Sequence, residues 1–165
     1  MLKRKLKNIM SKFNIKNLKP NSHYKSGVIN PGSCKKLYES QQNKPIIYRS
    51  SYEKSFILFL ERNPKVARWG SECIKIPYEI NGEKHSYYPD FVVTMKDNDI
   101  ELTYLIEVKP YNQTIRPQSA NHNDYQWNTY KTNIYKWKAA LQFCEQHNMK
   151  FKILTENTIN KLKWL

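Results

Sequence analysis

The first strong pattern along the chain is an apolar run that has helix signals at both ends. Ser50 is followed three residues later by Glu53, the arrangement of a capping box, and Asn63-Pro64 ends the helix. The apolar residues from Phe56 to Leu60 cover much of the helix circumference. We therefore expect a largely buried helix over residues 50–64.

Strand patterns follow this helix. Apolar and polar residues alternate from Ile74 to Ile80, which is typical of a half-buried strand. Asn81-Gly82 comes next and is the strongest short signal for a β-hairpin. A turn at this dipeptide pairs Tyr78 with His85 and Ile76 with Tyr87.

Two further runs, 87–93 and 104–110, are rich in β-branched and aromatic residues and predict strands joined by a polar turn at 96–99. If this turn centres on Asn98-Asp99, Phe91 pairs with Ile106 and Asp90 lies directly opposite Glu107. Lys109 is two residues beyond Glu107, so its side chain points to the same face.

Together the hairpins predict a three-strand meander with one apolar face and one mixed face. The apolar face collects Ile74, Ile76, Tyr78, Ile80, Tyr87, Phe91, Val93, Tyr104, Ile106 and Val108. The mixed face collects Asp90, Glu107, Lys109, Val92 and Leu105. We expect the helix over 50–64 to cover part of the mixed face. Pro89 cannot donate to the ladder, so it marks a bulge or an opening of the strands.

A longer helix is expected from about Asp124 to His147. Its apolar positions recur at spacings of three and four and form one stripe, made of Trp127, Tyr130, Ile134, Trp137, Leu141 and Cys144. We assign this stripe to the apolar face of the sheet, which leaves the charged face open. A strand over 151–155 then runs parallel to the strand of Glu107, and a short helix over 159–165 ends the chain. This order predicts an α/β fold with a mixed sheet flanked by helices on both faces.

Charge divides the chain into two parts. The net charge is +14, and residues 1–49 hold 12 Lys and Arg against a single acid, Glu39. We therefore predict a basic, partly extended arm over 1–48 and a folded domain over 49–165. The excess of positive charge indicates a polyanionic partner, and we favour double-stranded DNA over an anionic membrane. No apolar run approaches the ~18 residues of a membrane span.

Six basic residues are candidates for DNA contacts: Lys3, Arg4, Lys5, Lys7, Arg49 and Arg116. The alternative for the arm is a solvated tail that only aids solubility. Arg116 lies in a polar loop over 111–123 that follows Lys109 directly, and a purely solvated loop is the alternative there.

The facing carboxylates suggest a metal site. Like charges directly opposite each other are destabilising, because their Cβ atoms lie about 4.5–5.5 Å apart. Mg²⁺ relieves the repulsion and is often held by one or two carboxylates with water and phosphate. Lys109 adds a positive charge for a phosphate or an oxyanion. The alternative is an exposed hairpin without a site. The role of Glu53 has two alternatives at this stage: it caps its helix, or it is a third carboxylate of the site.

At this point the chain resembles the PD-(D/E)XK nuclease superfamily, through Pro89-Asp90 and Glu107-Val108-Lys109 separated by a hairpin. Further segments resemble the head completion nucleases of T-even type tailed phages, which are similar to the TnsA-type transposon endonucleases. These segments are Arg49-Ser50-Ser51-Tyr52-Glu53, Asn63-Pro64, Trp69, Ser71-Glu72, Ile76-Pro77-Tyr78 and Tyr88-Pro89-Asp90-Phe91. The likeness covers about residues 46–156.

The resemblance implies an αβββαβ restriction-endonuclease-like core and a Mg²⁺-dependent DNA nuclease, with Mn²⁺ as an alternative ion. It implies catalytic roles for Glu53, Asp90, Glu107 and Lys109. The implied metal ligands are Asp90, Glu107, Glu53 and the carbonyl of Val108. For Glu53, the resemblance favours a catalytic role, which is compatible with capping the helix.

The biological role comes from the resemblance alone. It places the protein late in capsid assembly, around DNA packaging and head–tail joining, with phage head and neck proteins as partners. The expected location is the host cytoplasm during assembly, with retention in the virion as an alternative. Two rival functions remain: a non-catalytic DNA-binding component of the head or neck, and a transposase-type endonuclease subunit.

Overall fold

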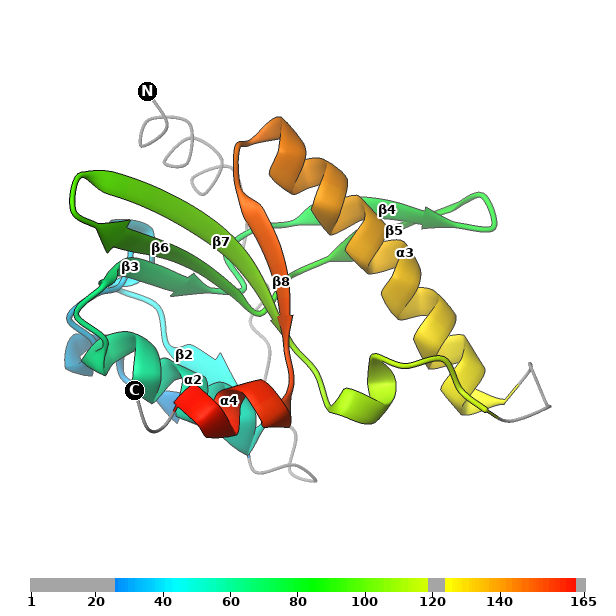
Figure 1. Cartoon of the computed structure of the whole chain (residues 1–165), viewed down its shortest axis with the longest axis horizontal. Coiled ribbons are helices and arrows are strands. Elements are labelled where there is room, and N and C mark those ends of the chain that lie inside the picture. The colour runs from blue at the N-terminus through cyan, green and yellow to red at the C-terminus, as the bar shows by residue number, and fades with distance from the viewer. Residues whose placement is uncertain (1–25, 119–123, 163–165) are drawn as a thin grey trace.

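A four-stranded mixed sheet with helices on both faces forms the folded domain (Figure 1). The structure is a computed structural model of the chain and describes residues 26–118 and 124–162. Its elements in chain order are β1 (Gly27–Ile29), η1 (Pro31–Ser33), η2 (Glu39–Gln41), β2 (Ile46–Tyr48), α2 (Ser51–Arg62), β3 (Val66–Ser71), β4 (Ile76–Ile80), β5 (Glu83–Tyr87), β6 (Phe91–Asp97), β7 (Ile100–Val108), η3 (Tyr111–Gln113), α3 (Tyr125–Gln146), β8 (Lys150–Leu154) and α4 (Glu156–Leu162). The sheet order is β3-β6-β7-β8, with β8 parallel to β7 and the other pairs antiparallel. The predicted fold class is confirmed.

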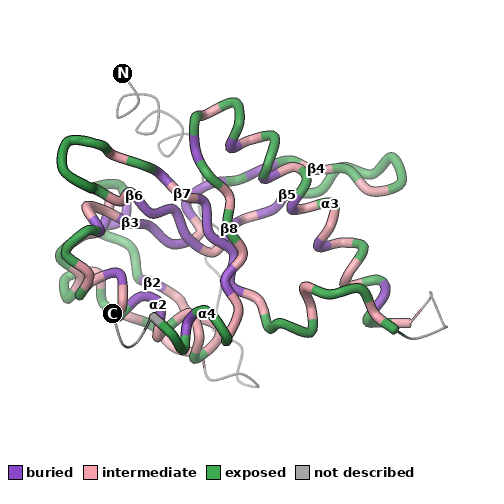
Figure 2. Tube along the Cα trace, in the orientation of Figure 1, coloured by how far each residue is buried: buried purple, intermediate pink, exposed green. Residues whose placement is uncertain are grey.

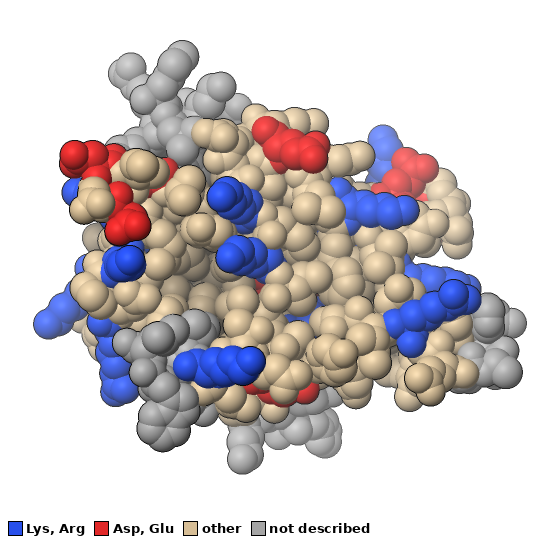
Figure 3. Space-filling model, viewed as in Figure 1, with Lys and Arg blue, Asp and Glu red and all other residues tan. Residues whose placement is uncertain are grey.

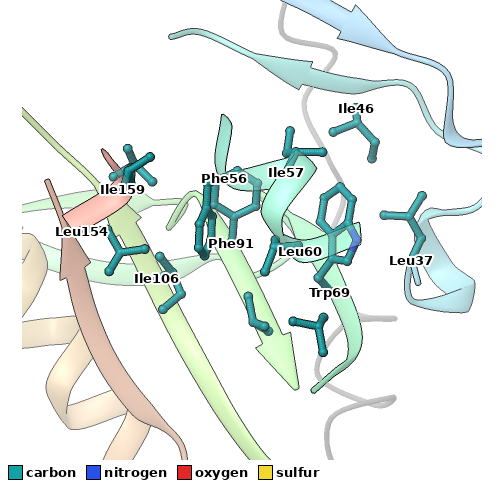
Figure 4. Packing of buried hydrophobic residues seen from close by; sticks show 13 residues of the cluster. Leu37, Ile46, Phe56, Ile57, Leu60, Trp69, Phe91, Ile106, Leu154 and Ile159 are labelled. Carbon is teal, nitrogen blue, oxygen red and sulfur yellow. The ribbon is translucent and has the colours of Figure 1, made fainter. Parts of the chain in front are cut away.

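Each face of the sheet has its own helical layer. The layer of α2 and α4 shares one core cluster with the sheet, made of Leu37, Ile46, Phe56, Ile57, Leu60, Val66, Trp69, Phe91, Val93, Ile106, Val108, Leu154 and Ile159 (Figure 4). On the opposite face, Ala140 and Cys144 of α3 pack with Val92 and Leu105. Figure 2 shows that buried residues concentrate in the central strands, whereas α3 is buried along only part of its surface.

The two long helices begin and end where the capping residues predict. The Ser50 hydroxyl accepts a hydrogen bond from the Glu53 N–H at 3.1 Å, and Asn63 is the C-cap of α2. The Asp124 side chain accepts from the Trp127 N–H at 2.8 Å at the start of α3. Side chains that satisfy the first free N–H groups thus fix both helix starts.

Both predicted hairpin registers are confirmed. Ile76 pairs with Tyr87 across the Asn81-Gly82 turn, and both turn residues have positive φ angles. Phe91 pairs with Ile106 across the second turn. The predicted three-strand meander is wrong, however, because β4 and β5 form a separate two-stranded sheet. The third strand of the meander is β3, which pairs with β6.

The predicted assignment of helices to faces is also wrong. The α2 helix packs on the face of Phe91 and Ile106, and α3 packs on the face of Val92 and Leu105. Ile74, Ile76 and Tyr87 belong to the α3 side as well, not to the predicted apolar set. Both faces of the central strands are apolar, which is typical of a sheet covered on both sides.

The buried stripe of α3 is rotated from the predicted one. Leu141 is 50% exposed, which contradicts its place in the predicted stripe. The buried residues of the helix are Trp127, Asn133, Trp137, Ala140 and Cys144. The rotation turns the side of Asn133 and Ala140 toward the sheet, and Lys136 lies on that side.

The described part of the predicted arm packs against the domain. β1 pairs with β2, and Leu37 and Ile46 are buried in the α2-side core. The predicted contacts of Lys3, Arg4, Lys5 and Lys7 lie outside the described residues. Within 26–118 and 124–162, no helix has the length and apolar character needed to span a membrane.

Candidate active site

Asp90 and Glu107 lie together at adjoining ends of β6 and β7. Asp90 immediately precedes β6, whose first residue pairs with the residue before Glu107. The Val108 N–H donates a 2.7 Å hydrogen bond to Asp90 Oδ2. The hairpin register therefore brings the two predicted carboxylates together at this edge.

Glu107 is almost completely buried, at 2% exposure, and both of its oxygens have partners. The Tyr87 hydroxyl donates to Oε2 at 2.6 Å, and Lys109 Nζ lies 2.9 Å from Oε1. A short O–H donor and an ammonium are the strong kinds of partner for a carboxylate. They fix the orientation of Glu107 from both sides.

The charges of the cluster shift each other's proton affinity. Burial raises the pKa of Asp90 well above its ordinary value, the nearby Glu107 carboxylate raises it further, and Lys109 opposes the shift. Burial lowers the pKa of Lys109, but Glu107 and Asp90 outweigh that effect, so its pKa lies above the ordinary value. The negative charges of the two carboxylates therefore favour the ammonium form of Lys109.

Glu53 both caps its helix and contributes to the electrostatics of the cluster. Its Oε2 accepts from the Arg49 N–H at 2.9 Å, and its Oε1 accepts from the Ser50 hydroxyl at 2.9 Å. Its negative charge raises the pKa of Asp90 and that of Lys109, so it is close enough to act on both. Its predicted roles as a catalytic acid and as a metal ligand stay predictions.

Arg49 and Arg116 both have partners within the protein. Arg49 forms a two-point ion pair with Glu72, in which Nη2 donates to Oε2 at 3.1 Å. The Glu72 N–H in turn bonds the Asp90 carbonyl at 3.0 Å. The Arg116 guanidinium lies over the Trp127 ring, 5.2 Å from its centroid. DNA contact by either arginine stays a prediction.

Sequence reasoning missed three residues of the site: Glu72, Tyr87 and Lys136. Glu72 has a φ of 45°, a conformation that only the folded structure reveals. Lys136 Nζ lies over the Tyr87 ring, 5.8 Å from its centroid. Burial and the charge of Lys109 lower the pKa of Lys136, while Glu107 and Asp90 oppose the shift. In the sequence of α3, nothing distinguishes Lys136 from the exposed lysines of the same helix.

The donor set fits a hard divalent cation bound by few protein ligands. Asp90 and Glu107 supply two carboxylates, and Mg²⁺ commonly takes one or two of these with water and substrate phosphate. No group of three acidic, His or Cys side chains is placed for a metal among residues 26–118 and 124–162. Such a cation would offset the repulsion that raises the pKa of Asp90. Glu53, and the carbonyl of Val108, stay predicted rather than observed ligands.

Comparisons with known proteins agree with this geometry. A family model described as "TnsA-like endonuclease N terminal" matches residues 63–156, which include Asp90, Glu107 and Lys109. The head completion nuclease of Enterobacteria phage T4 is 38% identical over 132 residues, a match that spans 72% of this chain and 84% of that protein. Glu53 lies N-terminal to the family-model match.

Proposed function

We propose that this chain hydrolyses phosphodiester bonds of double-stranded DNA with the help of Mg²⁺. The chain belongs to the TnsA-like endonuclease family and is therefore a nuclease. The observation that carries the proposal is the pair formed by the half-buried Asp90 and the buried Glu107, with Lys109 bonded to Glu107. Two neighbouring carboxylates that repel each other beside a fixed ammonium fit a site for a divalent cation and a phosphate, in the manner of PD-(D/E)XK nucleases.

The residues have distinct roles in this proposal. Asp90 and Glu107 hold the cation, which supplies activation of water and neutralisation of phosphate charge. The Val108 N–H holds one oxygen of Asp90, and the Tyr87 hydroxyl holds one oxygen of Glu107. The Lys109 ammonium stabilises the negative charge that grows on the phosphate as the bond breaks. Glu53 supports the site from the start of α2.

A plasmid assay tests the activity. The wild-type protein is expected to nick or linearise supercoiled DNA with Mg²⁺ and to lose that activity in EDTA. Asp90→Asn is expected to abolish cleavage, because the cation loses a charged ligand. The matched control is Asp97→Asn at the far end of β6. The Asp97 side chain is 75% exposed, and its Oδ1 lies 3.5 Å from Lys65 Nζ.

Three results would contradict the proposal: no cleavage by folded wild-type protein, cleavage that persists in EDTA, or full activity of Asp90→Asn. A protein that binds the plasmid with no cleavage under any condition would instead support the non-catalytic DNA-binding alternative.

The proposal extends to phage head completion, DNA packaging termination and head–tail joining. The name and identity of the T4 relative support this role. Partners would then be head and neck proteins in the host cytoplasm or the assembled virion, whereas a transposase-type subunit would meet transposition proteins. In the encoding phage, an Asp90→Asn allele is expected to leave filled heads without tails in electron micrographs. Normal particles would contradict the assembly role without bearing on the nuclease chemistry.

A further inference from the structure

The active site has a second lysine that the predicted motif does not contain. Lys136 lies on α3, which packs across the Val92 and Leu105 face of the sheet. Its half-buried side chain extends to the ring of Tyr87, the residue whose hydroxyl bonds Glu107. Lys136, Tyr87 and Glu107 therefore form a continuous path from α3 into the carboxylate pair.

The two lysines of the site differ in what holds them. Lys109 is bound to Glu107 at 2.9 Å, and its side chain is 25% exposed. Lys136 makes no ion pair with any residue in the part of the chain that the structure describes, and only the face of Tyr87 holds it. Glu107 already has the Tyr87 hydroxyl on one oxygen and the Lys109 ammonium on the other, and its remaining lone pairs are those that the proposed cation would take.

We propose that Lys136 binds a phosphate of the DNA strand that enters this site. The inference rests on the proposed function, since it names the group that receives the substrate. An ammonium that is partly desolvated and has no internal anion is ready for an external one. The face of the Tyr87 ring attracts the Lys136 ammonium and holds it near the site, and an aromatic ring does not neutralise the positive charge.

Basic side chains also lie elsewhere on this side of the molecule. Figure 3 shows Lys and Arg side chains spread over the face that contains α3 and β8, with acidic side chains mainly along its upper edge. Such spread charge favours DNA in general and does not single out one position. Lys136 differs because its ammonium lies over the ring of Tyr87, whose hydroxyl bonds Glu107.

Three variants of α3 separate phosphate binding from packing. Lys136→Met keeps the length and apolar stem of the side chain but removes its charge, and Lys136→Arg keeps the charge. Lys138→Met is the matched control, because Lys138 is exposed and lies two residues further along the same helix, on another side. Circular dichroism and thermal unfolding verify that all three remain folded.

The assay measures kcat/KM for plasmid nicking with Mg²⁺ across a series of NaCl concentrations. Lys136→Met is expected to lose about 10-fold to 100-fold in kcat/KM, as for loss of a hydrogen bond to a charged group. The plot of log kcat/KM against log salt should also become shallower by about 0.9, the share of one phosphate contact. Lys136→Arg should keep most of the rate and the wild-type slope, and Lys138→Met should match wild type.

Each other outcome has a defined meaning. If wild type cleaves and Lys136→Met equals both wild type and Lys138→Met, the inference is overturned and the nuclease function stands. A lower rate with an unchanged salt slope, and with no rescue by Lys136→Arg, also overturns it, because packing would then explain the loss. If folded wild type does not cleave with Mg²⁺, the proposed function fails and the inference fails with it.

Discussion

The hydrogen bond from Tyr87 to Glu107 is the most sharply defined support of the site. Tyr87→Phe removes only the hydroxyl, whose oxygen lies 2.6 Å from Glu107 Oε2 in a buried position. A hydrogen bond of this length to a carboxylate is of the charge-assisted kind. Bonds to charged groups contribute about 1.5–3 kcal/mol to stability. For a chain of this size, that loss lowers the melting temperature by roughly 3–12 °C.

Calorimetry in EDTA measures this loss without a contribution from bound metal. Plasmid nicking by the same variant should also slow, because Glu107 then loses the partner on one of its oxygens and can turn about its bond to Lys109. Tyr78→Phe is the control, since Tyr78 lies in the same β4–β5 hairpin and is only half-buried, with its ring stacked on His85. Its loss of a hydroxyl is expected to change stability by less than about 0.5 kcal/mol.

Equal melting temperatures for Tyr87→Phe and Tyr78→Phe would refute the reasoning about stability. Wild-type nicking rates in Tyr87→Phe would refute the assignment of Tyr87 as a positioning residue. The two measurements are separate, because a site can lose orientation without a large loss of folding free energy.

Three further predictions concern Asp90, the helix cap and the rotation of α3. Because the pKa of Asp90 is raised in the folded chain, the folded state binds that proton more tightly, and metal-free protein should lose stability as pH rises above about 4. Asp90→Asn should reduce this loss in thermal unfolding scans between pH 4 and 8, and an unchanged pH dependence would contradict the assignment. Ser50→Ala removes the hydroxyl that accepts from the Glu53 N–H and should cost about 0.5–2 kcal/mol in urea unfolding, whereas no change would argue against the cap. Ala140→Leu should destabilise by about 1–3 kcal/mol, because Ala140 is fully buried. Leu141→Ala should cost less than about 1 kcal/mol in the same assay, since half of Leu141 is exposed, and the reverse order would refute the observed rotation.

Local signals predicted the registers, the helix limits and the carboxylate pair. Asn81-Gly82 fixes its hairpin through positive φ angles at both residues, so neighbouring pairs follow without knowledge of the rest of the chain. The turn before β7, where Asn98 has a positive φ, likewise sets the register that places Asp90 beside the end of that strand. These features depend on short stretches of sequence, and sequence reasoning is strongest there.

The faces of the sheet could not be predicted in the same way. Val92 and Leu105 on one side are as apolar as Phe91 and Ile106 on the other, and all four are buried. Alternation says which residues share a face, but not which helix covers that face. The error in turn hid Lys136, because the large aromatic residues of α3 suggested a stripe that leaves this lysine out of the site.

Pro89 explains how the Tyr87 hydroxyl reaches Glu107. In one continuous strand, Tyr87 would share a face with Phe91 and point away from Glu107, because side chains alternate. The strand is instead interrupted between Tyr87 and Phe91, where Pro89 cannot donate to a ladder. Because of this interruption, Tyr87 packs with Val92 and Leu105 on the α3 side, and its hydroxyl bonds Glu107 there. The break at Pro89 thus does more than open the strand, because it lets Tyr87 point to the side of Glu107, where the Lys136 ammonium lies over the Tyr87 ring.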